Sequence, residues 1–253
     1  MNDIKILEMA YLSQNVYEAK NKLPEYMNNW FIPKNFKNLY SPTSDFFARL
    51  YLRKNQAGQM DAAVVAFRGT MPLQHLTNDI ADFQIALLHE LPIRYQAARV
   101  FFHKARSYVR ENYPGVRIKL TGHSLGGALA QLIAAKNKQI AVVFNSPGIA
   151  DLPEIHSSEH YQPYIHNINS TDDAIHKIGR TIGTVQNIDV IQGEQELQNA
   201  EKVSYKITDL PAEIVLKAEY QLYEKSAGAF KQHLIANMID ALQHHPDIAS
   251  VRY

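Results

Sequence analysis

Residues 122–127, Gly-His-Ser-Leu-Gly-Gly, contain the serine of this chain that is best placed for nucleophilic chemistry. An apolar, strand-like run at residues 116–121 precedes them, and an apolar, helix-like run at residues 125–135 overlaps and follows them. Such a layout is typical of a nucleophile elbow, a tight strand-to-helix turn that exposes the serine hydroxyl. Glycines two residues to either side are expected because side chains there would collide with the turn. The pattern predicts Ser124 as a nucleophile, and the alternative is a plain glycine-rich turn.

Strand-like and helix-like patterns alternate around this turn, which predicts a mostly parallel sheet covered by helices. Upstream, the sequence predicts a helix at residues 3–17, an irregular excursion at 20–45, and a hairpin of strands at 47–53 and 62–67. Further along we expect a helix at 93–112, strands at 140–144 and 164–169, two strands within 184–210, and helices at 211–228 and 234–242. Neither a repeat nor a shift in composition marks a boundary, so we expect a single domain over residues 1–253.

Composition sets limits on the partners and the compartment. A net charge of +1 gives no basic face for nucleic acid, so no nucleic-acid partner is expected. The absence of cysteine excludes disulfides, thiol catalysis and thiolate metal sites. Residues 1–8 carry acids where a signal peptide needs a basic region, and the longest apolar runs fall short of the roughly 18 residues of a membrane span. We expect a soluble protein that is cytoplasmic or exported by a signal-independent route.

A nucleophilic serine needs an acid and a histidine base, and in α/β-hydrolases these follow the serine in that order. The strand expected at 164–169 delivers Asp172 and Asp173, and either carboxylate could serve. Of the eleven histidines, only four follow these aspartates: His176, His233, His244 and His245.

Position along the chain separates these four histidines. His176 is three residues from Asp173 and is expected on the same turn, where it cannot easily reach the serine. His244 and His245 precede Pro246 and are expected at a solvated surface. His233 comes between a glycine-containing loop and an apolar helix, where a loop-borne base should lie, and it is the predicted base.

Residues 66–70, Ala-Phe-Arg-Gly-Thr, end an apolar strand upstream of the elbow, where the first oxyanion donor is expected. Here the chain resembles the class 3 lipase family, the fungal-type triacylglycerol lipases and their bacterial relatives. By this match Thr70 is the oxyanion residue and would donate its backbone N–H and its hydroxyl. The second donor would be the backbone N–H of Leu125, the residue after the nucleophile.

The resemblance continues in three further motifs. These are Asn-Asp-Ile-Ala-Asp at residues 78–82, Phe-Asn-Ser-Pro-Gly at 144–148, and Asp-Ala-Ile at 173–175. The last of them favours Asp173 over Asp172 as the acid. The match covers residues 47–180 with good motifs and His233 with a weaker one, whereas residues 1–45 and 184–225 carry no motif that can be transferred.

The resemblance implies an α/β-hydrolase fold, with a mostly parallel central sheet flanked by helices. It implies a serine hydrolase that cleaves carboxylic ester bonds of lipids, as a triacylglycerol lipase or phospholipase A, through an acyl-enzyme on Ser124. The expected partner is a lipid or ester substrate, with peripheral membrane contact and without a metal or organic cofactor. The alternatives are a short-chain carboxylesterase, a lipase effector or toxin delivered to another cell, and, least favoured, a non-catalytic binding module with this fold.

Three segments allow two interpretations each. The apolar residues 71–91 could form a lid or acyl-pocket wall, or an ordinary core helix. Residues 30–37 interleave aromatics with lysines, as interfacial anchors do, although packing of the excursion on the domain is the commoner explanation. His75, Asp79 and Asp82 lack the spacing of a metal site, and Asp82 is expected instead to pair with Arg68 behind the oxyanion loop.

Overall fold

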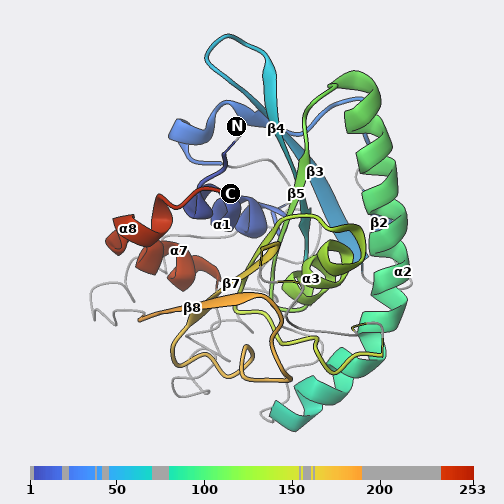
Figure 1. Ribbon diagram of the computed structural model, residues 1–253, viewed down its shortest axis with the longest axis vertical. Coiled ribbons are helices and arrows are strands. Elements are labelled where there is room, and N and C mark those ends of the chain that lie inside the picture. The colour runs from blue at the N-terminus through green and yellow to red at the C-terminus, as the bar shows by residue number, and fades with distance from the viewer. Residues whose placement is uncertain are drawn as a thin grey trace.

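Eight strands form one sheet in the computed structural model, which describes residues 3–18, 23–37, 39–41, 46–69, 80–153, 155, 161, 163–189 and 235–253. Only the backbone is described at 39–41 and 80–90. The strands are β1 (Trp30–Phe31), β2 (Leu39–Ser41), β3 (Phe46–Lys54), β4 (Met60–Phe67), β5 (Ile118–His123), β6 (Ala141–Phe144), β7 (Ile165–Ser170) and β8 (Thr184–Ile188). Their order is β1-β3-β4-β5-β6-β7-β8, and β2 also pairs with β3 (Figure 1).

The strands from β4 to β8 are parallel, while β3 pairs with β4 as an antiparallel hairpin. The hairpin and the mostly parallel sheet confirm the prediction from the alternating patterns. Because parallel strands end at the same edge of a sheet, the residues that follow β4, β5, β6 and β7 meet at one edge. That edge receives residues 68–69, Ser124, Asn145 and the turn that contains Asp173.

Helices cover both faces of this sheet (Figure 1). They are α1 (Ile6–Asn15), a 3₁₀ turn η1 (Glu25–Met27), α2 (Ile80–Asn112), α3 (Leu125–Asn137), α7 (Ile235–His244) and α8 (Pro246–Ala249). One apolar core joins the sheet to α2 and α3, and a second core joins its other face to α1 and α7. Within the described part of the chain, no helix is both long and apolar enough to span a membrane.

Several predicted elements differ from the observed ones. Helix α2 was expected at 93–112 but begins at Ile80 and continues through Pro92. Proline favours the first turn of a helix, and inside a helix it removes one backbone hydrogen bond and its ring crowds the preceding turn, but α2 nevertheless continues through Pro92. The helix expected at 234–242 is confirmed as α7, and one of the two strands expected within 184–210 is β8. The second of those strands and the helix expected at 211–228 lie outside the described residues.

The excursion at 20–45 is less irregular than expected because β1 and β2 add to the outer edge of β3. Trp30 is only 2% exposed, and its indole N–H donates to a carboxylate oxygen of Glu8 at 2.9 Å. Phe36 packs against the rings of Phe101 and Tyr108, with centroids 5.5 and 5.1 Å away. These aromatics therefore pack on the domain rather than form an exposed membrane anchor.

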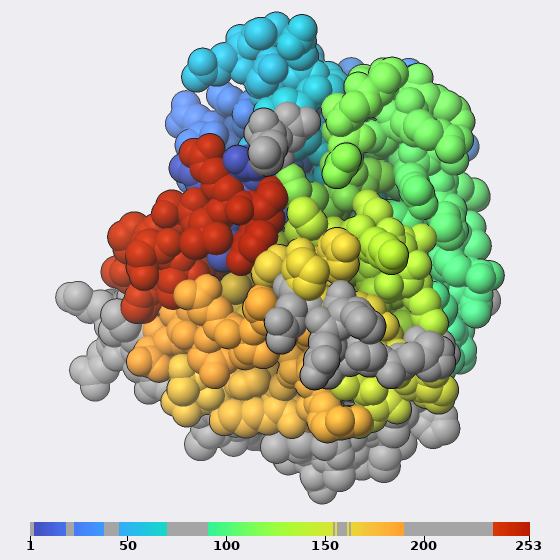
Figure 2. Space-filling model, in the orientation of Figure 1, coloured from blue at the N-terminus to red at the C-terminus, as the bar shows by residue number. Residues whose placement is uncertain are grey.

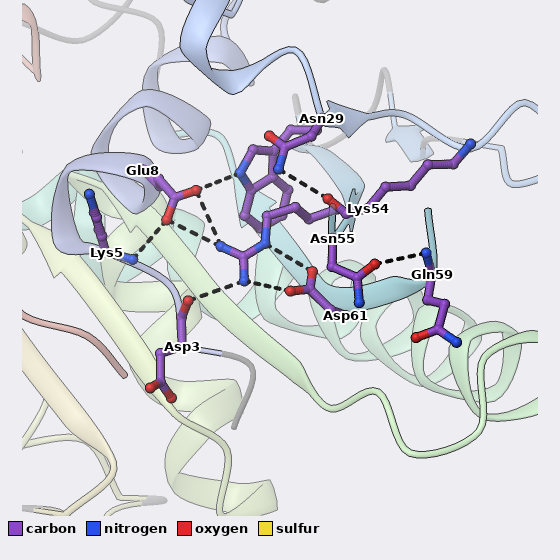
Figure 3. Close-up of polar contacts among 10 residues, drawn as sticks. Asp3, Lys5, Glu8, Asn29, Lys54, Asn55, Gln59 and Asp61 are labelled. Carbon is purple, nitrogen blue, oxygen red and sulfur yellow. Dashed lines mark hydrogen bonds and ion pairs between the residues drawn. The ribbon is translucent and has the colours of Figure 1, made fainter. Parts of the chain in front are cut away.

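An ion-pair network around Arg53 fixes the start of α1 to the hairpin (Figure 3). The guanidinium donates two bonds to the carboxylate of Asp61, at 3.0 and 3.1 Å. It also donates to Glu8 of α1 at 3.3 Å and to the backbone carbonyl of Asp3 at 3.1 Å. The bidentate pair with Asp61 holds the guanidinium in a specific orientation on the hairpin, and its bonds to Glu8 and Asp3 then attach the start of α1 there.

Candidate active site

Ser124 forms the turn between β5 and α3, as the glycine pattern predicted. Its backbone lies at φ 57° and ψ −132°, a region that residues with a side chain rarely adopt. The surroundings hold this conformation, because the Ser124 N–H donates to the Phe144 carbonyl of β6 at 3.1 Å and the Ser124 carbonyl accepts from Gly127 at 2.9 Å. Such a turn is the geometry of a nucleophile elbow.

At three positions around the serine only glycine fits, because a Cβ would collide with neighbouring atoms. A Cβ at Gly122 would overlap the backbone of Gly126, and a Cβ at Gly126 would overlap the carbonyl of Phe67 at the end of β4. A Cβ at Gly127 would come within 2.6 Å of the side chain of Ser146. The glycines therefore let α3 begin in direct contact with the ends of β4 and β6, and the predicted collisions are confirmed.

The chain leaving β4 passes directly beside the nucleophile. A Cβ at Gly69 would lie 2.7 Å from the carbonyl oxygen of His123 and 3.3 Å from the Cβ of Ser124. Thr70, the predicted oxyanion residue, is the next residue along and lies outside the described residues. Leu125, the other predicted donor, is the first residue of α3, where backbone N–H groups have no acceptor within the helix. A helix N-terminus also favours negative charge.

Arg68, which directly follows β4, contacts the hairpin. Its backbone N–H donates to the carbonyl of Phe47 at 3.0 Å, and its guanidinium lies 5.3 Å from the centroid of the Phe47 ring. The side chain of Asp82, its predicted ionic partner, lies outside the described residues, as do His75 and Asp79. Across the side chains that are described, no group of three His, Cys, Asp or Glu residues could hold a metal ion.

The two candidate acids have opposite environments. Asp173 is completely buried in the turn after β7, whereas Asp172 is exposed. The Asp173 N–H donates to the Ser170 carbonyl at 3.1 Å, and its Oδ2 accepts from the backbone N–H of His176 at 2.8 Å. The Nδ1 of His176 lies 3.3 Å from the same oxygen. A buried carboxylate must be hydrogen-bonded, and here the turn itself supplies donors.

Asn145 connects the end of β6, whose Phe144 carbonyl binds the Ser124 N–H, to the end of β7, which leads to Asp173. It follows β6 at a positive φ of 43°, and its side chain bonds Ser170 twice. Its Nδ2 donates to the Ser170 hydroxyl at 3.2 Å and its Oδ1 accepts from the Ser170 N–H at 2.7 Å. The resemblance to the lipase family included Asn145 in a motif but gave it no role.

The candidate histidines also differ in their exposure to water. His176 lies on the turn with Asp173, as expected, and His244 is exposed, with Nδ1 donating to the Asp240 carbonyl at 3.0 Å. His245 was expected to face water, but it is only partly exposed, because it is the N-cap of the short helix α8 and its Nε2 is buried. His233, the predicted base, lies outside the described residues.

One further residue near the serine was not predicted from the sequence. Tyr17, just beyond α1, accepts a hydrogen bond from the Gly69 N–H at 2.9 Å. It comes from residues 1–45, where no motif could be transferred. Only the folded chain brings it beside the elbow.

Several solved lipases share this architecture. The Lip2 lipase from Yarrowia lipolytica is 17% identical, with 73% of this chain and 77% of that chain covered and a TM-score of 0.52. The nonglycosylated form of Lip2 gives a TM-score of 0.55 at the same identity, over 73% and 78% of the two chains. The Rhizomucor miehei lipase propeptide complex is 14% identical over 72% and 67%, with a TM-score of 0.51. This likeness defines the fold as that of the α/β-hydrolases.

Sequence comparison defines the family more closely. The profile of a phospholipase-like family, described as a Tle-like phospholipase domain, matches residues 8–239, so the chain belongs to this family. ATG15 of Candida glabrata, whose curated name includes the word lipase, is 49% identical over 55 residues. That match spans 22% of this chain and about a tenth of the length of the relative. Family and fold together support lipid ester hydrolysis.

The backbone conformation of Ser124 leads to a stability prediction. Relief of strain at this position should make Ser124→Gly more stable to unfolding than Ser124→Ala by about 1 to 2 kcal/mol. The measurement is urea denaturation of both variants. The matched control is Ser13, which is buried within α1. There glycine should be less stable than alanine by about 1 kcal/mol. If the alanine variant were the more stable one at both positions, the backbone of Ser124 would not be strained.

Proposed function

We propose that the chain hydrolyses carboxylic ester bonds of membrane phospholipids, as a phospholipase A, through an acyl-enzyme on Ser124. The observation that carries this proposal is the elbow: a serine at positive φ, at the start of a helix and against the end of β4. Membership of a phospholipase-like family supports phospholipid as the substrate, ahead of triacylglycerol or a short-chain ester. We propose that one α/β-hydrolase domain performs the whole reaction.

In the first half-reaction the Ser124 hydroxyl attacks the ester carbonyl carbon while His233 accepts its proton. The carbonyl oxygen becomes an oxyanion, which binds the N–H groups of Thr70 and Leu125. The tetrahedral intermediate then expels the alcohol, which takes the proton from His233, and the acyl group stays on the serine. Water adds to the acyl carbon with His233 again as base, and the fatty acid leaves as the Ser124 hydroxyl re-forms.

Asp173 is the proposed acid because of its environment. It is buried at the active edge of the sheet, two strands from the nucleophile, while Asp172 is exposed to water. A buried carboxylate next to an imidazole fixes its tautomer and stabilises the imidazolium that forms during the reaction. His176 orients this carboxylate through the two contacts to Oδ2.

The roles of His233 and Thr70 rest on their places in the chain. His233 comes two residues before Ile235, the first residue of α7, and follows both Ser124 and Asp173 as the order of α/β-hydrolases requires. Thr70 comes directly after Gly69, which lies against Ser124. Neither role needs a residue from another molecule.

The triad makes a ranked prediction for activity. Asp173→Asn should lower kcat by about 10⁴, because the imidazole loses its correct tautomer. The matched control, Asp172→Asn, should cost less than about tenfold because that side chain faces water. The measurement is hydrolysis of p-nitrophenyl esters of increasing chain length and of phosphatidylglycerol vesicles. The reverse ranking of the two variants would transfer the role to Asp172.

The same assay separates the base and the substrate class. His233→Ala should abolish turnover with an unchanged circular dichroism spectrum, while a His244→Ala/His245→Ala double variant should retain kcat. Loss in the double variant with full activity in His233→Ala would show that the base was chosen wrongly. Rapid hydrolysis of short esters without fatty-acid release from vesicles would identify a short-chain carboxylesterase instead.

We also propose that one face of α2 contacts the membrane. Ile93 and Val100 are 64% and 46% exposed and lie seven residues apart, on one side of the helix. Exposed Arg99, Arg106 and Arg110 follow an adjacent line, whereas residues 91–112 contain a single carboxylate, Glu111. Basic residues beside exposed aliphatic ones are typical of a helix that lies on an anionic lipid surface. Helix α2 forms an outer flank of the molecule (Figure 2).

Charge reversal tests this contact. Arg99→Glu/Arg106→Glu/Arg110→Glu should lower binding to phosphatidylglycerol vesicles more than tenfold, because each basic residue near such a surface contributes about 1 kcal/mol. Vesicle co-sedimentation is the measurement, and hydrolysis of a soluble short ester should not change. Lys34→Glu/Lys37→Glu, on the exposed edge of the residue 30–37 excursion, is the control. Equal loss in both variants would indicate a general charge effect and contradict a specific face.

A further inference from the structure

Tyr17 contacts two chain segments beside the nucleophile, one through a backbone N–H and the other through a side chain. Its hydroxyl accepts from the N–H of Gly69, on the chain leaving β4, at 2.9 Å. The same hydroxyl lies 3.4 Å from Nδ1 of His123, the residue immediately before Ser124. The Tyr17 and His123 rings meet edge-on, with centroids 6.3 Å apart at 66°. A hydroxyl can accept one bond and donate another, so this one can connect the two segments.

Buried side chains of β3 hold the backbone on both sides of Tyr17. Arg49 donates from Nη1 to the carbonyl of Asn15 at 2.7 Å and from Nη2 to the carbonyl of Glu18. The Tyr51 hydroxyl donates to the Asn15 side chain at 2.9 Å. Arg49 is 4% exposed and Tyr51 is completely buried. Since Asn15 and Glu18 lie before and after Tyr17, the backbone that carries this tyrosine is fixed to the sheet.

The fit between Tyr17 and Gly69 leaves no room for a side chain. A Cβ at Gly69 would lie 2.5 Å from the Tyr17 hydroxyl oxygen, closer than carbon and oxygen can approach. The contact therefore depends on glycine at residue 69, immediately before the proposed oxyanion donor Thr70. A bond to the Gly69 N–H restrains the peptide that leads into this donor.

We infer that Tyr17 is a positioning residue: it fixes the oxyanion side of the site against the nucleophile through Gly69 and His123. This inference rests on the proposed function. Oxyanion donors stabilise the transition state only when they are held in place before charge develops, and a displacement of about 1 Å can cost about 10²-fold in rate. Tyr17 supplies this restraint from the turn that follows α1, in a region where the sequence showed no functional motif.

The test is Tyr17→Phe, which removes the hydroxyl and keeps the ring. We expect kcat for a p-nitrophenyl ester, and the rate at which a fluorophosphonate modifies Ser124, to fall about tenfold, with KM within about twofold. The melting temperature should change by less than about 2 °C, because one net hydrogen bond contributes only about 1 kcal/mol.

The matched control is Tyr11→Phe, since Tyr11 is a nearby tyrosine on α1 whose hydroxyl also accepts a hydrogen bond, from the Gln243 side chain at 2.7 Å. It should retain the wild-type kcat and labelling rate. An unchanged kcat in Tyr17→Phe would overturn the inference, as would a loss of stability without loss of rate. Activity that persists in Ser124→Ala would instead overturn the proposed function, so the two failures can be distinguished.

Discussion

The candidate site depends on a close approach of backbone at Ser124, where three chain segments meet without side chains between them. Gly126 at the start of α3 lies against the Phe67 carbonyl, Gly122 lies against Gly126, and Gly69 lies against the His123 carbonyl. This contact places the first turn of α3 beside the end of β4. The positive φ of Ser124 is unfavourable by itself and persists because neighbouring strands fix the residues around it. A larger residue at any of these glycines would separate the serine from the loop that leads to Thr70.

The parallel sheet brings further residues to this local contact. Parallel strands β4 to β7 end at one edge, so residues far apart in sequence lie together there. Phe144 anchors the serine backbone, and its neighbour Asn145 bonds Ser170, at the end of the strand that leads to Asp173. The serine and the proposed acid are thus held through one continuous set of backbone and side-chain bonds. Helix α1, fixed by Arg53 at its start and Arg49 at its end, covers the sheet face opposite to α3, and the turn that follows it adds Tyr17 to the site.

The sequence predicted those features that depend on local patterns. The elbow follows from the glycine spacing, and the hairpin and last helix follow from apolar periodicity. The start of α2 was wrong because Pro92, typical of a first turn, lies inside the helix. Tyr17 and Asn145 could not be predicted as site residues, because their roles depend on partners 52 and 25 residues away. Burial of Asp173 likewise depends on the whole sheet. His233 and Thr70 stay predictions.

The proposed mechanism requires Ser124 to be an activated nucleophile, and covalent labelling tests this most directly. The protein is treated with a fluorophosphonate, and the adduct is counted by intact mass and located by peptide mass spectrometry. We expect one adduct per chain, on Ser124, and none in Ser124→Ala. Labelling that persists in Ser124→Ala, or that maps to another serine, would contradict the account.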